Sequence, residues 1–237
     1  MGGKKKPILP LLWPWCDLEG TPLRPIYLLR SRAFSYTYVI VVLGIWNFIG
    51  PGHWSNCVTL GERLACSGGL WPEKIFSATH EFYLSFFTAP LFHNSSQHIF
   101  YVVFIGFIIF VQSFEGRNGA KATFIMFYLS ILIAGTVAVL TMHIGHSIWP
   151  DNEIFASALK RYWTGGSGGF MGVLGALSHH SRRKWTIPVL LILFEIWNRY
   201  GNGISEFITF THLTSALFGY IIWGWWLQRQ SKTADSR

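Results

Sequence analysis

The chain has 237 residues and a net charge of +8, and it is 51% hydrophobic, 17% aromatic and only 13% charged. Soluble domains carry roughly 25% charged residues, so this composition excludes an ordinary soluble domain. The positive charge does not indicate nucleic-acid binding, because the basic residues stand between apolar runs, as they do in the cytoplasmic loops of membrane proteins. The 12 tryptophans also fit a membrane protein, since Trp collects at membrane interfaces.

The first 33 residues are basic and rich in proline, and they contain no apolar span. We interpret residues 1–33 as a cytoplasmic segment. A secretory signal peptide is not expected, because the stretch after Lys4-Lys5-Lys6 is broken by Pro and Trp and has no small-residue cleavage site. The first candidate transmembrane helix covers residues 34–49 and ends at Gly50-Pro51-Gly52, and such residues commonly follow a helix end.

A long loop of mixed composition, residues 50–97, follows this helix. Its second half, residues 75–92, is aromatic but is interrupted by polar residues and a proline. We therefore expect this half to be partly embedded in the membrane without crossing it. Cys57 and Cys66 form a disulfide if the loop faces an oxidising compartment, and two unpaired thiols are the alternative.

Five more apolar runs predict further membrane helices, and they cover about residues 98–114, 122–142, 167–178, 187–197 and 207–227. The fold class is thus all-α and polytopic, with a six-helix membrane domain over residues 34–228, a polar segment at 143–163 and a tail at 229–237. With both termini in the cytoplasm, 14 of the 19 Lys and Arg residues lie on the inner side. This is a strong positive-inside bias, and we expect insertion in the plasma (inner) membrane.

A serine among glycines, in the sequence Gly165-Gly166-Ser167-Gly168-Gly169, lies directly ahead of the fourth apolar run. The distance from Ser167 to Ser181, just before a basic cluster, is about 15 residues or roughly 22 Å of helix, whereas a full crossing needs about 20 residues. Ser167 is therefore expected below the outer surface, in a water-accessible pocket. His212 follows Glu206, at the outer end of the sixth run, by six residues and reaches a similar depth.

These two side chains suggest nucleophilic catalysis. A serine hydroxyl needs a base within hydrogen-bond reach, and a neutral histidine is suitable. No acidic residue of the sixth run lies near the expected depth of His212, so the sequence predicts a Ser167–His212 dyad and not a triad. The Ser167 N–H and the His98 side chain are the expected oxyanion donors. Glu195, in the fifth run, is expected to pair with Arg199, four residues later.

The order of these motifs resembles the rhomboid family of intramembrane serine proteases, over roughly residues 85–225. The residues that carry the resemblance are His93-Asn94-Ser95-Ser96-Gln97-His98, Glu115-Gly116-Arg117, Gly165-Gly166-Ser167-Gly168 with Gly175, and His212 with Ala216 and Gly219. The resemblance implies a six-helix bundle with a long, partly embedded first loop, which cleaves transmembrane segments near the outer membrane face. Ser167 would be the nucleophile, His212 the base, and His98 part of the oxyanion site.

Two positions depart from the family pattern. Val102 stands where the family usually has an asparagine that donates to the oxyanion, and losing one such donor lowers rates by about 10²–10³-fold. Met171 stands where a tyrosine often packs on the catalytic imidazole, and a methionine orients a ring less firmly. The alternative is therefore a catalytically impaired pseudoprotease that binds membrane clients without cutting them.

A metal-dependent enzyme that uses the histidines is a second alternative, although the chain lacks an HExxH motif. We expect no cofactor and no metal. The expected partners are single-span or other transmembrane protein substrates and the lipid bilayer, and no nucleic acid.

Overall fold

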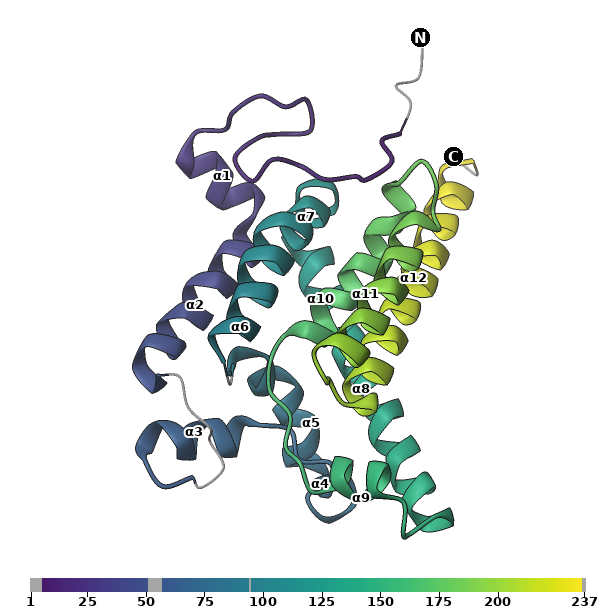
Figure 1. Cartoon of the computed structure of the whole chain (residues 1–237). Helices are drawn as coiled ribbons and strands as arrows, with labels where there is room; N and C mark the ends of the chain where they lie inside the picture. The colour runs from purple at the N-terminus through teal and green to yellow at the C-terminus, as the bar shows by residue number, and fades with distance from the viewer. Residues whose placement is uncertain (1–5, 51–56, 94, 236–237) are drawn as a thin grey trace.

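The structure is a computed structural model that describes residues 6–50, 57–93 and 95–235. Within these ranges the chain is helical apart from loops and two isolated β-bridges, and it contains no strand. The all-α class predicted from the apolar runs is thereby confirmed. The helices run between two ends of the molecule, with the N-terminal segment and α7 at the upper end in Figure 1 and α3, α4 and α9 at the lower end.

The elements lie close to the predicted runs. In chain order they are α1 (Pro25–Ser31), α2 (Ala33–Ile49), α3 (Leu60–Gly68), α4 (Lys74–Ser77), α5 (Thr79–Thr88), the 3-10 turn η1 (Ala89–Leu91), α6 (Ser96–Ile99), the π-helical segment η2 (Phe100–Val111), α7 (Gln112–Asn118), α8 (Ala120–Ile148), α9 (Glu153–Leu159), α10 (Ser167–Leu177), the 3-10 turn η3 (Ser178–His180), α11 (Thr186–Gly201) and α12 (Glu206–Asp235).

Several of these helices are long and apolar enough to cross a membrane, so the chain is a membrane protein. They are Ser96–Asn118, Ala120–Ile148 and Glu206–Thr233, and α1 with α2 adds a fourth if this pair, bent by 95°, counts as one span. Helices α10 and α11 have only 11 and 16 residues. Within the described residues, length and composition therefore support three or four crossings, while the prediction was six.

Two segments outside the predicted membrane helices also contain helix. The polar segment at 143–163 is largely helical, because α8 continues to Ile148 and α9 folds back on it. Gly145 makes this packing possible, since a Cβ there would overlap the ring of Phe155. The tail expected from residue 229 is also helical, because α12 runs on to Asp235.

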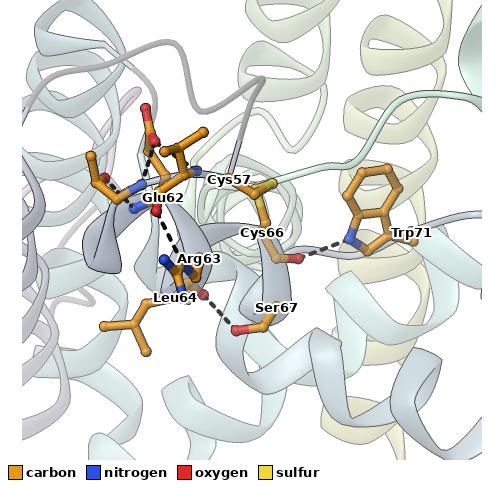
Figure 2. The surroundings of a disulfide bond; sticks show 9 residues. Cys57, Glu62, Arg63, Leu64, Cys66, Ser67 and Trp71 are labelled. Carbon is orange, nitrogen blue, oxygen red and sulfur yellow. Dashed lines mark hydrogen bonds between the residues drawn. A yellow bond between two sulfur atoms is a disulfide. The ribbon is translucent and has the colours of Figure 1, made fainter.

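The long first loop is a compact arrangement of short helices. A disulfide joins Cys57 to Cys66, and the Trp71 indole N–H donates to the Cys66 carbonyl at 2.8 Å (Figure 2). Of the two alternatives for Cys57 and Cys66, the disulfide is therefore confirmed and two unpaired thiols are excluded. Leu70 and Trp163 then exchange two backbone hydrogen bonds of 2.8 and 2.9 Å, so the loop is tied to the segment that precedes Ser167.

Helix α10 lies at the centre of the bundle, and every residue from Gly169 to Leu177 is buried. At Gly175 and Gly219, the backbones of α10 and α12 lie too close together for a side chain. A Cβ at Gly175 would overlap the Ala216 carbonyl oxygen, and a Cβ at Gly219 would overlap the Gly172 carbonyl oxygen. Small residues allow helix backbones in membranes to approach this closely. The two helices that carry Ser167 and His212 are thus held in direct backbone contact.

A cluster of buried polar side chains holds together the end of the bundle at which α7 lies. Glu115 on α7 accepts hydrogen bonds from the backbone N–H of Phe34 and of Ser35, both at 2.8 Å, and from the Ser35 hydroxyl at 2.5 Å. The buried Arg32 donates to the Gln112 side chain at 3.0 Å, and Gln112 donates to the backbone of residue 12 at 2.6 Å. The N-terminal segment, residues 6–24, is thereby fastened across this end of the bundle.

Candidate active site

The segment before Ser167 has a backbone that only glycine adopts easily. Gly165 has φ +99°, and its N–H donates to the Ala89 carbonyl at 2.8 Å. A Cβ at Gly165 would overlap the His98 ring, and one at Gly166 would overlap the Tyr38 hydroxyl. These two glycines let the chain enter α10 tightly, so that Ser167 becomes the first residue of the helix.

Ser167 and His212 meet, although 45 residues separate them. The Ser167 Oγ lies 2.9 Å from His212 Nε2. His212 is on the second turn of α12 and is only 7% exposed, whereas Ser167 is half-buried and faces a cavity. The geometry is that of a nucleophile and a base, because the hydroxyl can pass its proton to the imidazole nitrogen.

A carboxylate completes this arrangement on the far side of the imidazole. His212 Nδ1 lies 2.9 Å from Glu195 Oε1, and Glu195 is 1% exposed. The prediction that His212 has no carboxylate partner is therefore wrong, because it considered acidic residues of the sixth run only and Glu195 lies on α11. The expected pairing of Glu195 with Arg199 is also wrong, because Arg199 forms an ion pair with Glu206 instead.

The rotation of α11 explains this correction. Its buried residues are Ile187, Leu191, Glu195 and Asn198, so they repeat every three or four positions on one helix face. Most residues exposed on the other faces are large and apolar, and they include Val189, Leu190, Ile192, Leu193, Ile196 and Trp197. In a lipid environment the polar residues of a helix turn inward, and this spacing is the sequence signal that could have placed Glu195 beside a partner helix.

The third predicted residue, His98, lies in the same cavity as Ser167 and His212. Its ring packs edge-to-face on the ring of His93 at a centroid distance of 4.7 Å. His93 is 2% exposed, and burial, together with neighbouring His98, lowers the pKa of His93 well below its usual value. His93 thus stays neutral behind His98.

The two departures from the family pattern also belong to this cavity. Val102 and Met171 line it, and each is only 2% exposed. The Val102 side chain has no hydrogen-bond donor. The polar donors that the sequence analysis assigned to an oxyanion are then the Ser167 N–H, at the start of α10, and the His98 ring.

The cavity has a volume of about 400 Å³, in the range of small-ligand and peptide side-chain sites. Its walls are mainly apolar and include Phe86, Ile131, Phe170, Phe194 and Phe207. Among the residues that the structure describes, no three His, Cys, Asp or Glu side chains are grouped as a metal ion would require. The cavity brings an apolar binding surface to the Ser167 hydroxyl.

Comparisons of this chain with protein-family models, with curated proteins and with solved structures find no match. The functional interpretation therefore depends on the geometry of the site and on the motif resemblance described above.

Proposed function

We propose that this protein is a serine endopeptidase of the rhomboid type, which cleaves the transmembrane segments of other proteins. The observation that carries the proposal is the 2.9 Å contact between the Ser167 hydroxyl and His212 Nε2, at the wall of a cavity between apolar helices. A nucleophile and its base at hydrogen-bond distance are the minimum requirement for acyl transfer.

The reaction follows from these positions. Ser167 Oγ attacks the scissile carbonyl carbon while its proton moves to His212 Nε2. The negative oxygen is stabilised by the Ser167 N–H at the N-terminus of α10 and by His98. The C–N bond then breaks as His212 protonates the leaving amine, which leaves an ester between the substrate and Ser167. Water, deprotonated by His212, hydrolyses this ester and releases a carboxylate.

The proposal includes a membrane arrangement with six crossings and both termini in the cytoplasm. The crossings are α2, the continuous α6–η2–α7 helix, α8, α10, α11 and α12, and the first loop is partly embedded. The shortness of α10, with 11 residues, supports this arrangement because a helix that starts below the membrane surface needs less length to reach the other side.

The substrate class follows from the same placement. A helical peptide has its carbonyl groups in internal hydrogen bonds and its backbone shielded by side chains, so a client segment must be locally extended to reach Ser167. Transmembrane clients with helix-destabilising residues near the cleavage point are therefore the expected substrates.

The experiment combines labelling with cleavage. The full chain in detergent is treated with a fluorophosphonate, and cells co-express the chain with a panel of single-span clients. Labelling and cleavage are expected for the unchanged protein, and they are expected to fall to background in Ser167→Ala and to a small residual rate in His212→Ala. The matched control is Ser147→Ala, which removes an exposed hydroxyl on α8 and should retain both signals.

A pseudoprotease is the second candidate function, and Val102 is the observation that favours it. A folded, unlabelled protein that captures clients equally well before and after Ser167→Ala would support that function and contradict the protease.

A further inference from the structure

We infer that Glu195 is a positioning residue for His212 and converts the expected dyad into a Ser167–His212–Glu195 chain of hydrogen bonds. This inference deepens the proposed function and rests on it. It goes beyond the two-residue mechanism that the motifs indicate, because nothing in those motifs includes a position on α11.

The geometry of the His212 imidazole supports this role. Both ring nitrogens are occupied, with Nε2 at 2.9 Å from the Ser167 Oγ and Nδ1 at 2.9 Å from Glu195 Oε1. An ionised carboxylate can only accept a hydrogen bond. The proton of a neutral His212 must then be on Nδ1, which leaves the Nε2 lone pair directed at the serine hydroxyl. Glu195 thus selects the only tautomer in which His212 can act as the base.

The burial of the Glu195 carboxylate supports the same role. Glu195 is 1% exposed, and within the described part of the chain its Oε2 has no hydrogen-bond partner. A buried carboxylate with an unsatisfied oxygen lowers stability. A role in folding therefore does not explain why a glutamate stands at this position, whereas a role in holding a histidine does.

The charge that develops on His212 during the reaction also supports this role of Glu195. When Ser167 Oγ bonds to the substrate carbonyl carbon, its O–H bond breaks and the proton adds to Nε2, so His212 becomes a cation. The Glu195 carboxylate, hydrogen-bonded to Nδ1, stabilises that cation in a site where little water screens the pair. Glu195 keeps its own protonation state throughout, and the proton on Nε2 leaves with the departing amine.

The neighbouring charges do not compete for this role. Arg199 on α11 and Glu206 on α12 pair with each other, and the other titratable side chains that line the cavity, His98, Tyr101, Arg161 and Tyr162, are not carboxylates. Among the residues described, Glu195 is accordingly the acidic side chain bonded to the imidazole.

The test measures the rate constant of fluorophosphonate labelling of the full chain in lipid nanodiscs for three variants of Glu195. Glu195→Gln is expected to label on the order of 10²–10⁴-fold more slowly, because an amide can donate to Nδ1 and stabilise the wrong tautomer. Glu195→Asp restores a carboxylate and should recover part of the loss. Glu195→Ala is expected to be slow as well.

A double-mutant comparison separates positioning from a general structural effect. If Glu195 acts through His212, adding Glu195→Gln to His212→Ala should cause no further loss of the residual labelling. The matched control is Glu115→Gln, a change at an equally buried carboxylate at the other end of the bundle. Its folded fraction should label at a rate within a few fold of the unchanged protein.

A spectroscopic measurement tests the role of Glu195 without depending on activity. Nitrogen-15 NMR of the labelled histidines reports which ring nitrogen carries the proton, and His212→Gln identifies the signals of His212 among the 9 histidines. The unchanged protein and Ser167→Ala should show the Nδ1–H form, and Glu195→Gln should lose it.

The outcomes separate the two proposals. Equal labelling by folded Glu195→Gln and the unchanged protein, or an unchanged His212 tautomer in Glu195→Gln, would overturn the role of Glu195. A protein that never labels yet shows the Glu195-dependent tautomer would retain the positioning role and contradict the protease.

Discussion

Two carboxylates in this protein are equally buried, at 1% exposure, and yet they lie in opposite surroundings. Glu115 at the upper end in Figure 1 accepts three hydrogen bonds from the start of α2. Glu195 accepts one hydrogen bond, from His212, and within the described residues its second oxygen has no partner. Glu115 is bonded to two backbone amides and a hydroxyl, whereas Glu195 is bonded to an imidazole ring.

The difference shows how the protein divides its polar interior. At the Glu115 end, the carboxylate is bonded to the start of α2, while Arg32 and Gln112 bond to each other and to the N-terminal segment. At the other end, Glu195 Oε2 has no partner within the described residues. Buried polar groups are normally paired, so this unpaired oxygen beside the Ser167–His212 contact has a cost in stability.

The largest expected effect contrasts the two carboxylates directly. Glu115→Gln should lower the free energy of unfolding by about 3–5 kcal/mol, because an amide cannot accept from all three donors and leaves buried N–H groups unsatisfied. Glu195→Gln should change it by less than about 1 kcal/mol. Thermal unfolding of both variants in the same detergent measures the two changes in the free energy of unfolding. Equal losses of stability would contradict the expected difference between the two carboxylates.

The next effect tests the helix contact that joins the two ends. Gly175→Ala should destabilise the protein by about 1–3 kcal/mol, since a Cβ there overlaps the Ala216 carbonyl and forces α10 away from α12. The labelling rate should fall too, because the same shift separates Ser167 from His212. Gly44→Ala on α2 is the matched control. A Cβ there meets nothing within 4 Å, so that variant should be neutral or more stable by up to about 1 kcal/mol.

The smallest effect is a pH dependence at the Glu115 end. Burial, followed by the nearby Arg117, lowers the pKa of His180 to about 4, and His180 Nε2 accepts a hydrogen bond from the Asn118 amide at 3.1 Å. The unfolded chain binds this proton near pH 6.5, so the contribution of neutral His180 to stability is present above pH 6.5 and is lost as the pH falls toward 4.

His180→Gln keeps an acceptor and removes that titration. Denaturation at pH 7.5 and pH 4.5 should show a loss that is smaller by roughly 1–2 kcal/mol in the variant than in the unchanged protein. An identical loss in both proteins would show that other groups control acid stability at this end.

Much of the helical arrangement could be predicted because the apolar runs end at residues with a clear local preference. The first predicted helix, residues 34–49, differs from α2 by a single residue at its start, since Gly50 follows the helix end in both. The helical structure within the polar segment at 143–163 could not be predicted, because it depends on tertiary packing of Phe155 over Gly145. A local pattern does not contain that contact.

The same distinction applies to the site. The contact between Ser167 and His212 could be anticipated, because counting residues from each membrane boundary gives the depth of a side chain. The position of Glu195 depends also on the rotation of α11 about its axis, which is set by packing against α12. The pairing with Arg199 was inferred from sequence separation alone, and it ignored the fact that Arg199 reaches Glu206 on the neighbouring helix.

The backbone bridge between Leu70 and Trp163 has a mechanical consequence. It joins the loop that contains the disulfide to the segment that leads, two residues later, into the Gly165–Ala89 hydrogen bond and then to Ser167. Because these bonds join backbone groups, a side-chain substitution in the loop does not by itself remove the connection to the segment before Ser167.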